Sequence, residues 1–462
     1  MNPFPTRLMA CLGAAAGLAL VAPVCLGQVV NERVKGVATD GLAGDGLGCD
    51  VASDQGVIAV GACHDGDNGL DSGSAYLFNA STGAQLRKLT PSDGAPGDQF
   101  GYSIALRGGI VVVGAPYDVH NGVGSGSVYV FSASTGAQLA KLVPADGAAN
   151  DWFGWSVAID NGIVAVGAYG DDDQGTQSGS AYLFDAATGA QLDKLLPDVG
   201  GASQSFGISI AMEGSMVAVG SRAHFVPSVG FRLGTVWLFD AQSGNQLRTL
   251  TASNGTSTDQ FAEDIDIDGG LVAVGAWGRS VFFDHSGAMY VFDAQTGDEL
   301  HYIFPADGHD RDNFGVSIAI SNGIVAVGAH QDGDNGFDAG SAYLFDATSG
   351  AQINKLLASD GVQFDYFGTS VDIDGDSIVI GAIGDADNGP DAGSLYIFGD
   401  ATTAPCPTDI DGSGVTDLGD LNVVLFNFGN TVPSGTGGDC DANGTVDLVD
   451  LNLVLFSFGS AC

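Results

Sequence analysis

The sequence predicts an all-β protein: a seven-bladed β-propeller of four-stranded blades, followed by a small α-helical module. Three observations predict this architecture, namely a unit that recurs seven times, four strand-like segments within each unit, and two acidic loops near the C-terminus. Glycine accounts for 72 of the 462 residues, well above the ~7% of average proteins. Such a composition suits a fold that consists of short strands and tight turns.

The repeated unit is marked by the segment Gly-Ser-Ala-Tyr-Leu-Phe, which begins at Gly73. Related segments follow at intervals of 53 or 55 residues and begin at Gly126, Gly179, Gly234, Gly287, Gly340 and Gly393. A Phe-Gly pair keeps the same interval and is present at Phe100, Phe153, Phe206, Phe314 and Phe367. Repetition at a fixed interval of this length indicates a propeller or a solenoid.

Each unit contains four strand signals, which are clearest in the third copy at residues 153–159, 162–168, 179–184 and 191–195. The second of these is almost wholly apolar, as expected of a strand that is buried on both faces. Between the first two strands, Asp160-Asn161-Gly162 predicts a tight hairpin turn, because Asn and Gly tolerate a positive φ. Four-stranded units that repeat radially form a propeller, and an open solenoid is the alternative.

The two ends of the repeat array predict how the ring closes. The last copy ends at Phe398 without a fourth strand, whereas residues 32–41, ahead of the first copy, align with residues 85–94 at the same interval of 53. We therefore expect the N-terminal segment to form the outer strand of the seventh blade. Such closure leaves no free sheet edge between the first blade and the last.

The N-terminus predicts export. Arg7 precedes an apolar stretch, Leu8 to Ala22, and small residues at positions 25 and 27 precede a cleavage site before Gln28. No later segment reaches the ~18 consecutive apolar residues of a membrane helix. We therefore expect a secreted chain with a signal peptide at 1–27, the propeller at 28–399, a linker at 400–405 and the C-terminal module at 406–462.

The charge of the chain restricts its partners. Lys and Arg total 14 against 55 Asp and Glu, which gives a formal net charge of -41. Such a surface repels nucleic acid and anionic lipid, and both classes of partner are excluded. Carboxylate oxygens are instead suited to hard cations such as Ca²⁺.

Acidic loops in three copies are candidate calcium sites within the propeller. In these loops, which join the second strand to the third, Asp alternates with other residues around a central Gly. The candidate ligands are Asp65, Asp67, Asp71, Asp332, Asp334, Asp338, Asp385, Asp387 and Asp391. Because the strands of a meander alternate in direction, these loops share one face of the disc with the loops that join successive blades. Plain Asp/Gly turns are the alternative interpretation.

The fourth and fifth copies depart from this pattern and carry basic and aromatic residues in the same region. The candidate partner-binding residues are Arg222, His224, Phe225, Phe231, Arg232, Trp277, Arg279, Phe282 and Phe283. Exposed aromatic side chains beside Arg are typical anchors of protein interfaces. Neutral drift in two degenerate copies is the alternative.

The C-terminal module contains two near-copies of an acidic loop, 30 residues apart. Oxygen ligands at loop positions 1, 3, 5, 9 and 12, with a backbone carbonyl at position 7, follow the pattern of an EF-hand calcium loop. The predicted ligands are Asp409, Asp411, Ser413, Val415, Asp417, Asp420, Asp439, Asp441, Asn443, Thr445, Asp447 and Asp450. Each loop leads into a helical apolar stripe, formed by Leu418, Leu421, Leu425 and Phe428 and by Leu448, Leu451, Leu455 and Phe458.

The repeats resemble a known family. The second copy contains Phe100-Gly101 followed by Gly114-Ala115-Pro116. This is the full pattern of the FG-GAP repeats of integrin α-subunit heads, which residues 31 to 398 resemble. In that family calcium typically sits in a longer acidic loop between the first and second strands, where this chain has a tight turn, so that metal site does not carry over. The C-terminal module resembles a dockerin, which implies bound calcium and docking to a cohesin-like domain.

These observations predict a secreted, calcium-binding protein that recognises or scaffolds an extracellular protein or polysaccharide. No HExxH, P-loop or dinucleotide motif is present. A Gly-x-Ser-x-Ala segment recurs at Gly101, Gly154 and Gly315, which favours a packing role because a single catalytic nucleophile would not recur. A carbohydrate-active enzyme or accessory subunit, a lyase or hydrolase on a cohesin-type scaffold, is the alternative.

The cysteines predict two disulfides. The chain has 7 Cys, of which two lie in the predicted signal peptide. Cys49 and Cys63 lie in adjacent strands on either side of a turn, within disulfide reach in a suitable register. Cys406 and Cys462 bracket the C-terminal module and are the second candidate pair.

Overall fold

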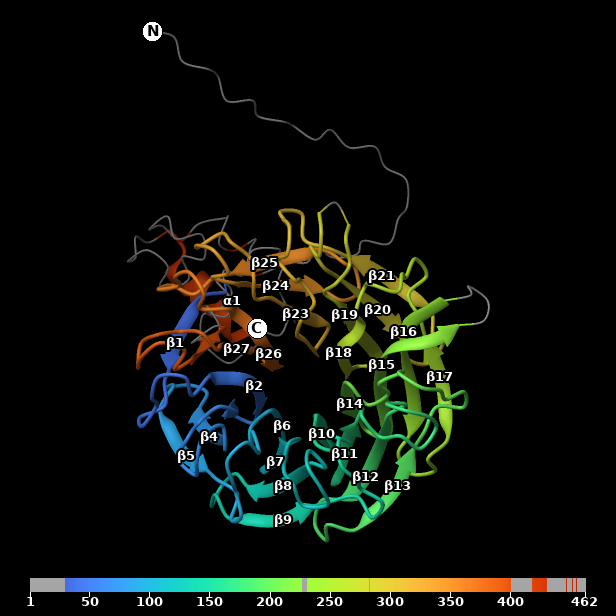
Figure 1. The fold of residues 1–462 in the computed structure, drawn as a ribbon. Coiled ribbons are helices and arrows are strands. Elements are labelled where there is room, and N and C mark those ends of the chain that lie inside the picture. Colours follow the sequence, from blue (N-terminus) through green and yellow to red (C-terminus); the bar gives the residue numbers. More distant parts are fainter. Residues whose placement is uncertain are drawn as a thin grey trace.

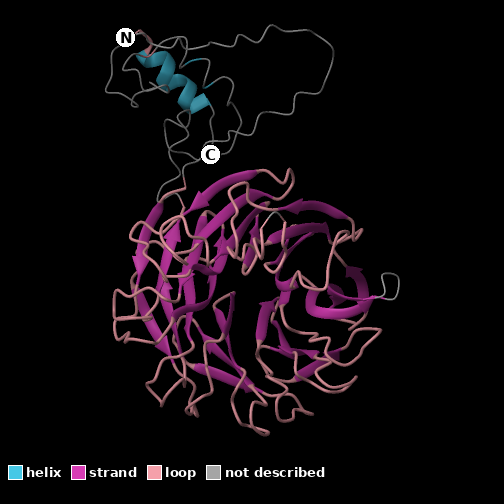
Figure 2. Ribbon diagram, turned by 45° about the horizontal axis from the view of Figure 1, so that its top comes forward, coloured by secondary structure: helices cyan, strands magenta, loops and turns pink. Residues whose placement is uncertain are grey.

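The computed structural model describes residues 30–226, 231–281, 283–399 and 418–429, together with residues 446, 451 and 454. The expected signal peptide at 1–27 and the linker at 400–405 lie outside these residues. Figure 2 shows that the regular structure of residues 30–399 is entirely β-strand. Among the described residues, no helix has the length and apolarity needed to cross a membrane.

Seven four-stranded antiparallel sheets surround a central channel, as the repeats predict (Figure 1). Within each blade the strands are a, b, c and d, with strand a beside the channel. Blade 1 contains β2 (Leu47–Asp54), β3 (Val57–Ala62), β4 (Ser74–Asn79) and β5 (Gln85–Leu89). Blade 2 contains β6 (Ser103–Arg107), β7 (Ile110–Ala115), β8 (Ser127–Ser132) and β9 (Gln138–Leu142). Blade 3 contains β10 (Ser156–Asp160), β11 (Ile163–Ala168), β12 (Ser180–Asp185) and β13 (Gln191–Leu195).

The remaining blades repeat this order. Blade 4 contains β14 (Ile210–Glu213), β15 (Met216–Val226), β16 (Phe231–Asp240) and β17 (Gln246–Leu250). Blade 5 contains β18 (Phe261–Asp268), β19 (Leu271–Ala276), β20 (Ala288–Asp293) and β21 (Glu299–Ile303). Blade 6 contains β22 (Ile318–Ser321), β23 (Ile324–Ala329), β24 (Ser341–Asp346) and β25 (Gln352–Leu356). Blade 7 contains β26 (Phe367–Asp374), β27 (Ser377–Ala382), β28 (Ser394–Phe398) and β1 (Glu32–Gly36).

The N-terminal strand closes the ring, which confirms the prediction from the two ends of the array. Strand β1 pairs antiparallel with β28, with Lys35 opposite Tyr396 and Gly36 opposite Leu395. The last blade therefore takes its outer strand from the beginning of the chain, and the first and last blades are held together by backbone hydrogen bonds.

The Phe-Gly pairs join neighbouring blades. Phe153 is fully buried and packs edge-on against Tyr182 and Phe184, with ring centroids 5.5 Å and 5.6 Å away. Its backbone forms a parallel bridge with Gly126, at the start of strand c in the preceding blade. Edge-to-face contacts of this kind add stability beyond the burial of apolar area. The same arrangement recurs at Phe100, Phe206, Phe314 and Phe367.

The glycine of the Gly-Ala pair in strand b is required by a close backbone approach. A Cβ on Gly61 would lie 1.9 Å from the carbonyl oxygen of Gly101 in the next blade. No side chain fits in that space, so the blades can pack this closely only with glycine at this position.

Blade 4 departs from the expected arrangement. The segment from Arg222 to Arg232 was expected to be an irregular loop, but β15 and β16 continue into it and pair as far as Val226 and Phe231. The pairing register shifts between Ser221 and His224, as in a β-bulge. Residues 227–230, at the tip, lie outside the described part of the chain.

In the C-terminal region the described helix is α1 (Leu418–Asn427), which begins within the last part of the first predicted calcium loop. Val424 is buried with Val446 and Val454, and Leu421 and Leu451 pack against them. The predicted stripe is therefore correct at Leu421 but wrong at Leu425 and Phe428, which are exposed. The buried face of α1 contains Val424 in place of Leu425, one residue earlier along the helix.

Candidate functional site

The acidic loops between strands b and c each hold a lysine. The loop face of the propeller is defined here as the face that carries these b–c loops and the d–a connections between blades. In blade 1, Nζ of Lys88 on β5 lies 2.8 Å from Asp65, 2.6 Å from Asp67 and 2.9 Å from Asp40. Asp65 and Asp67 belong to the b–c loop, whereas Asp40 belongs to the preceding d–a connection. One ammonium group thus joins both kinds of loop.

A buried tyrosine completes this arrangement. The hydroxyl of Tyr76 donates a hydrogen bond of 2.9 Å to Asp65, and Nζ of Lys88 lies 5.0 Å above the Tyr76 ring. Burial by itself lowers the pKa of Lys88, but hydrogen bonds to Asp65 and Asp67 outweigh that effect and raise the pKa well above its usual value. The lysine is therefore a permanent cation in this loop cluster.

Four further blades repeat the arrangement, with Nζ to carboxylate distances of 2.5 to 2.9 Å. The lysines and their carboxylates are Lys35 with Asp360, Asp385 and Asp387, Lys141 with Asp93 and Asp118, Lys194 with Asp146, Asp171 and Asp173, and Lys355 with Asp307, Asp332 and Asp334. The sequence reasoning missed these lysines. Their signal was a Lys in strand d that recurs at the repeat interval.

The predicted calcium ligands of the propeller are thus only partly brought together. The first two of each loop, such as Asp65 and Asp67, meet around the lysine, whereas Asp71 contacts His64 at 3.1 Å. Asp71, Asp338 and Asp391 all have positive φ values, of 54° to 56°. Within the described residues, no cluster of three or more His, Cys, Asp or Glu side chains is arranged to hold a metal ion. Calcium in these loops stays a prediction.

The basic residues of blades 4 and 5 form ion pairs within the propeller. Arg222 pairs with Glu263, and Nη1 of Arg279 lies 2.7 Å from the buried Asp259. Arg279 thus supplies the cation in blade 5, where Tyr302 occupies the position of the recurring lysine. Arg222 thus joins strand b of blade 4 to strand a of blade 5, whereas Arg279 joins the b–c loop of blade 5 to the d–a connection before it.

The aromatic residues of these two blades differ in environment. His224 contacts Gln204 and packs edge-on against Trp237. Trp277 stacks on His285, and Phe283 is exposed and stacks on His309. The side chains of Phe225, Phe231, Arg232 and Phe282 lie outside the described part of the structure.

The loop face also carries a cluster that sequence reasoning missed. We call it the aromatic patch; its rings are partly exposed and belong to Tyr102, Tyr117, Trp152, Trp155 and Tyr169. All five residues come from blades 2 and 3. A comparison of the repeats could have found it, because these positions are mostly non-aromatic in the other blades.

A cleft lies elsewhere on the loop face, between the d–a connection into blade 6 and the b–c loop of that blade. Its volume is about 420 Å³, and its lining includes His309, Arg311, Asp334 and Phe337. Clefts of about 300–1,000 Å³ are the usual size for small ligands.

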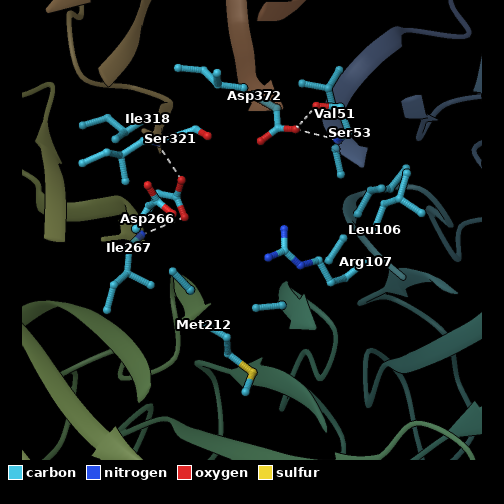
Figure 3. Close-up of a pocket in the computed structure, with 18 of the residues that line it drawn as sticks. Val51, Ser53, Leu106, Arg107, Met212, Asp266, Ile267, Ile318, Ser321 and Asp372 are labelled. Carbon is cyan, nitrogen blue, oxygen red and sulfur yellow. Dashed lines mark hydrogen bonds between the residues drawn. The ribbon is translucent and has the colours of Figure 1, made fainter. Parts of the chain in front are cut away.

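The central channel contains a second cavity, of about 260 Å³, lined by strand a of every blade (Figure 3). Asp50 accepts a hydrogen bond of 2.7 Å from the backbone N–H of Ile104, and Asp372 accepts one of 2.5 Å from that of Ser53. Each bond joins strand a of one blade to strand a of the next. The carboxylates therefore satisfy backbone donors at the inner edges of the sheets, which would otherwise lack partners.

The channel carboxyls have raised pKa values. Burial raises the pKa of Asp50 to about 8 and those of Asp264 and Asp372 to about 6. The side chain of Arg107 points into the cavity (Figure 3), with its guanidinium 3.8 Å from Asp54. The cavity is therefore lined by hydrogen-bonded carboxyls that connect neighbouring blades.

The recurring serines have structural roles. Oγ of Ser103 donates to the carbonyl of Gly154 at 2.9 Å, and Oγ of Ser156 donates to that of Gly207 at 3.0 Å. Each bond again joins one blade to the next. The Gly-x-Ser-x-Ala segments thus contribute to the contacts between blades.

The structure joins Cys49 and Cys63 in a disulfide, with Cα atoms 6.2 Å apart. The bond connects β2 to the residue that follows β3, beside the channel. Cys406 and Cys462 lie outside the described residues, as do eleven of the predicted calcium ligands in the C-terminal module. The twelfth, Asp420, lies in the first turn of α1.

Comparisons with known proteins support the repeat assignment. Six segments match the family described as FG-GAP repeat, at residues 30–78, 84–131, 137–184, 245–292, 298–345 and 351–398. The unmatched stretch between 184 and 245 contains strand d of blade 3 and strands a to c of blade 4, in which Trp237 replaces the recurring tyrosine.

The crystal structure of the computationally designed Ika8 protein (crystal packing No.1 in P63) is similar, with 17% sequence identity and a TM-score of 0.47, covering 80% of this chain and 99% of that chain. Among curated proteins, none matches the chain. Because the six matched segments span more than half of the residues, the chain belongs to the FG-GAP repeat family.

Proposed function

We propose that this chain is a secreted, calcium-binding protein for extracellular recognition or scaffolding. In this proposal the loop face of the propeller binds a protein or polysaccharide partner. The C-terminal module binds calcium through its two acidic loops and docks onto a cohesin-like domain.

The observation that carries the proposal is the set of apolar side chains at the tips of the b–c loops. Leu70, Val123 and Phe337 occupy equivalent positions and are 79%, 73% and 67% exposed. Large apolar side chains at loop tips add nothing to the core, and groups of them on one face mark interaction surfaces. The fold supports this role, because a rigid ring holds all of these loops on the same side.

The proposal for the C-terminal module rests on its sequence pattern and on α1. The helix begins at Leu418, in the last part of the first predicted loop, as it does in an EF-hand. Among the described residues, Val424 packs with four other apolar residues. A segment as short as 406–462 rarely buries enough apolar surface to fold without a further source of stability, which two bound calcium ions would supply.

The test compares the full-length secreted chain with a triple variant, Leu70→Ser, Val123→Ser and Phe337→Ser. Both are applied to arrays of glycans and of extracellular protein domains, including cohesins, with calcium or with a chelator. We expect the triple variant to lose binding to the propeller's partner but to keep cohesin binding. Chelation of calcium should abolish cohesin binding and leave binding to the propeller's partner intact. Partner binding that survives the triple substitution, or an absence of any partner, would contradict the proposal.

A further inference from the structure

The aromatic patch on blades 2 and 3 forms a continuous surface of rings. Trp152 and Tyr169 stack with their ring planes 28° apart and their centroids separated by 4.8 Å. Trp155 lies next to Tyr169 at 4.6 Å and to Tyr102 at 4.5 Å, and Tyr117 flanks Trp155 at 6.5 Å. The rings come from the d–a connections and from the beginnings of the b–c loops, so they belong to the loop face.

The fold does not require these rings. In the other blades the position of Tyr102 and Trp155 is occupied by Cys49, Ile208, Glu263, Val316 and Thr369. These blades have the same strands without an aromatic residue there. By contrast, the framework aromatics that recur in most blades, such as Phe153, are fully buried. The aromatic patch is therefore an addition to the framework, and its rings are partly exposed.

Trp152 is held in place by two glycines. A Cβ on Gly170 would lie 2.6 Å from Cε3 of the indole, and a Cβ on Gly124 would lie 3.2 Å from its Nε1. The backbone N–H of Trp152 also donates to the carbonyl of Gly124 at 3.0 Å. The indole is thus fixed before any ligand arrives, which reduces the entropy lost on binding.

The charges around the aromatic patch favour a neutral ligand. The nearby buried carboxylates already have partners: Asp118 binds Lys141 at 2.8 Å, Asp171 binds Lys194 at 2.9 Å, and Asp151 accepts the N–H of Ala148 at 2.6 Å. A cationic group could pair directly with these three carboxylates only by displacing those partners. An anionic ligand is repelled by the net charge of -41.

The ligand must also match flat rings with polar neighbours. A pyranose ring presents a face of C–H groups that stacks on an aromatic ring, and its hydroxyls accept and donate hydrogen bonds at the edge. The tyrosine hydroxyls of the patch provide such polar groups.

We infer that the aromatic patch is a binding site for neutral polysaccharide chains, whose sugar rings stack on Trp152, Trp155 and Tyr169. The inference rests on the proposed function, because it assumes that the loop face is the recognition surface. It narrows the partner from a protein or polysaccharide to an uncharged polysaccharide and assigns it to blades 2 and 3.

The test is affinity electrophoresis of the full-length secreted chain in gels that contain one soluble polymer each. The neutral probes are hydroxyethylcellulose, xyloglucan and galactomannan; carboxymethylcellulose is the anionic probe, and chitosan and polylysine are the cationic ones. We expect retardation by at least one neutral polymer and much weaker retardation by carboxymethylcellulose. The net charge of -41 also favours retardation by the two cationic probes, irrespective of the aromatic patch. Retardation by the cationic probes alone would overturn the inference, as would the absence of retardation by all three neutral polymers.

Three variants locate the site. Trp152→Ala should weaken binding at least about tenfold, and Trp152→Phe should retain more of the affinity because a ring remains. Phe337→Ala tests the loop tip of blade 6 as the competing location of the site. Thermal melting checks that each variant is folded. If Phe337→Ala abolishes binding and Trp152→Ala does not, the loop face is still the recognition surface and the assignment to the aromatic patch is wrong. If neither Trp152→Ala nor Phe337→Ala changes the affinity, the loop face is not the recognition surface and the aromatic patch is not the binding site.

Discussion

The ammonium nitrogen of Lys88 lies 2.8 Å from Oδ2 of Asp65, a carboxylate that is only 2% exposed. This pair occupies the loop in which the sequence predicts calcium. Removal of the lysine would leave a buried carboxylate without a cation, beside Asp40 and Asp67. Because an uncompensated buried charge is costly, the pair stabilises blade 1.

Lys88→Met should therefore lower the melting temperature of the propeller. The expected loss is on the order of 3 kcal/mol. Calcium should recover part of this loss in the variant, because Asp40, Asp65 and Asp67 then present oxygen ligands without a competing ammonium group. Calorimetry with calcium or a chelator measures both effects.

The matched control is Arg87→Met, which removes a neighbouring positive charge from the exposed side of the same strand. Exposed charges of this kind contribute about 0–1 kcal/mol. Equal losses in the two variants would contradict the structural role of Lys88. A propeller transition that responds to calcium as strongly in the wild type as in Lys88→Met would show that the lysine does not compete with calcium.

The stability of the propeller should decrease as the pH rises from about 5 to 8. Burial raises the pKa of Asp98, Asp151 and Asp312 to about 6 and that of Asp50 to about 8. Over this window the folded state binds more protons than the unfolded state, in which Asp has a pKa near 3.9. Stability therefore falls with increasing pH.

Below about pH 4 the opposite effect should appear. Hydrogen bonds to lysine outweigh burial and lower the pKa of Asp40, Asp146 and Asp307. The stability that these groups contribute is lost as the pH falls through their folded pKa. Melting curves between pH 3 and 9 at fixed calcium should thus show a maximum near pH 5, and Asp50→Asn should flatten the decline toward pH 8. A maximum at pH 8 would contradict this prediction.

Removal of β1 should open the ring. A chain that starts at Gly44 lacks both the strand that pairs with β28 and Lys35, which binds Asp385 at 2.7 Å. The exposed edge of β28 can then pair with other molecules. Light scattering after gel filtration should show aggregation, in comparison with a chain that starts at Gln28. A monomer with unchanged melting would contradict closure by β1.

Calcium should fold the C-terminal module. Each predicted loop gathers four Asp residues, whose mutual repulsion opposes the turn until a divalent ion is bound. In the full-length chain, chelation should make the region after residue 406 sensitive to limited proteolysis while the blades stay resistant. Substitution of Asp409 and Asp439 together by Ala should have the same effect in the presence of calcium. Equal resistance with and without calcium would contradict the prediction.

The repeat interval made most of the fold predictable. In the third copy the expected outer strand at 191–195 coincides with β13, and the turn at Asn161 and Gly162 has the expected positive φ values of 48° and 77°. These features depend on local residue types and on a spacing that is visible in the sequence. The prediction of the buried helical stripe was less accurate. Val424 and Leu425 are adjacent and both apolar, so only the packing of the helix shows which of the two is buried.

The contacts of the candidate sites were harder to predict. Lys88 and Asp40 are 48 residues apart and belong to adjacent blades, so their meeting depends on how the blades are arranged around the ring. The aromatic patch likewise combines Tyr102 with Trp155, which are 53 residues apart. The lysines recur at one position of the repeat, and the aromatic residues stand out at positions that are mostly non-aromatic in the other repeats. Their ion pairs and ring contacts, however, depend on which residues the fold brings close together.

The sequence by itself determined the number of blades, the four strands of each blade and the closure of the ring, because these follow from local strand and turn preferences repeated at one interval. The tertiary structure decided which charges meet. It placed the ammonium of Lys88 among carboxylates that the sequence alone suggested for calcium, and it gathered five aromatic rings on one face. The physical reason is that a cation and a carboxylate, or two rings, interact only at distances of a few ångströms, which the packing of neighbouring blades sets.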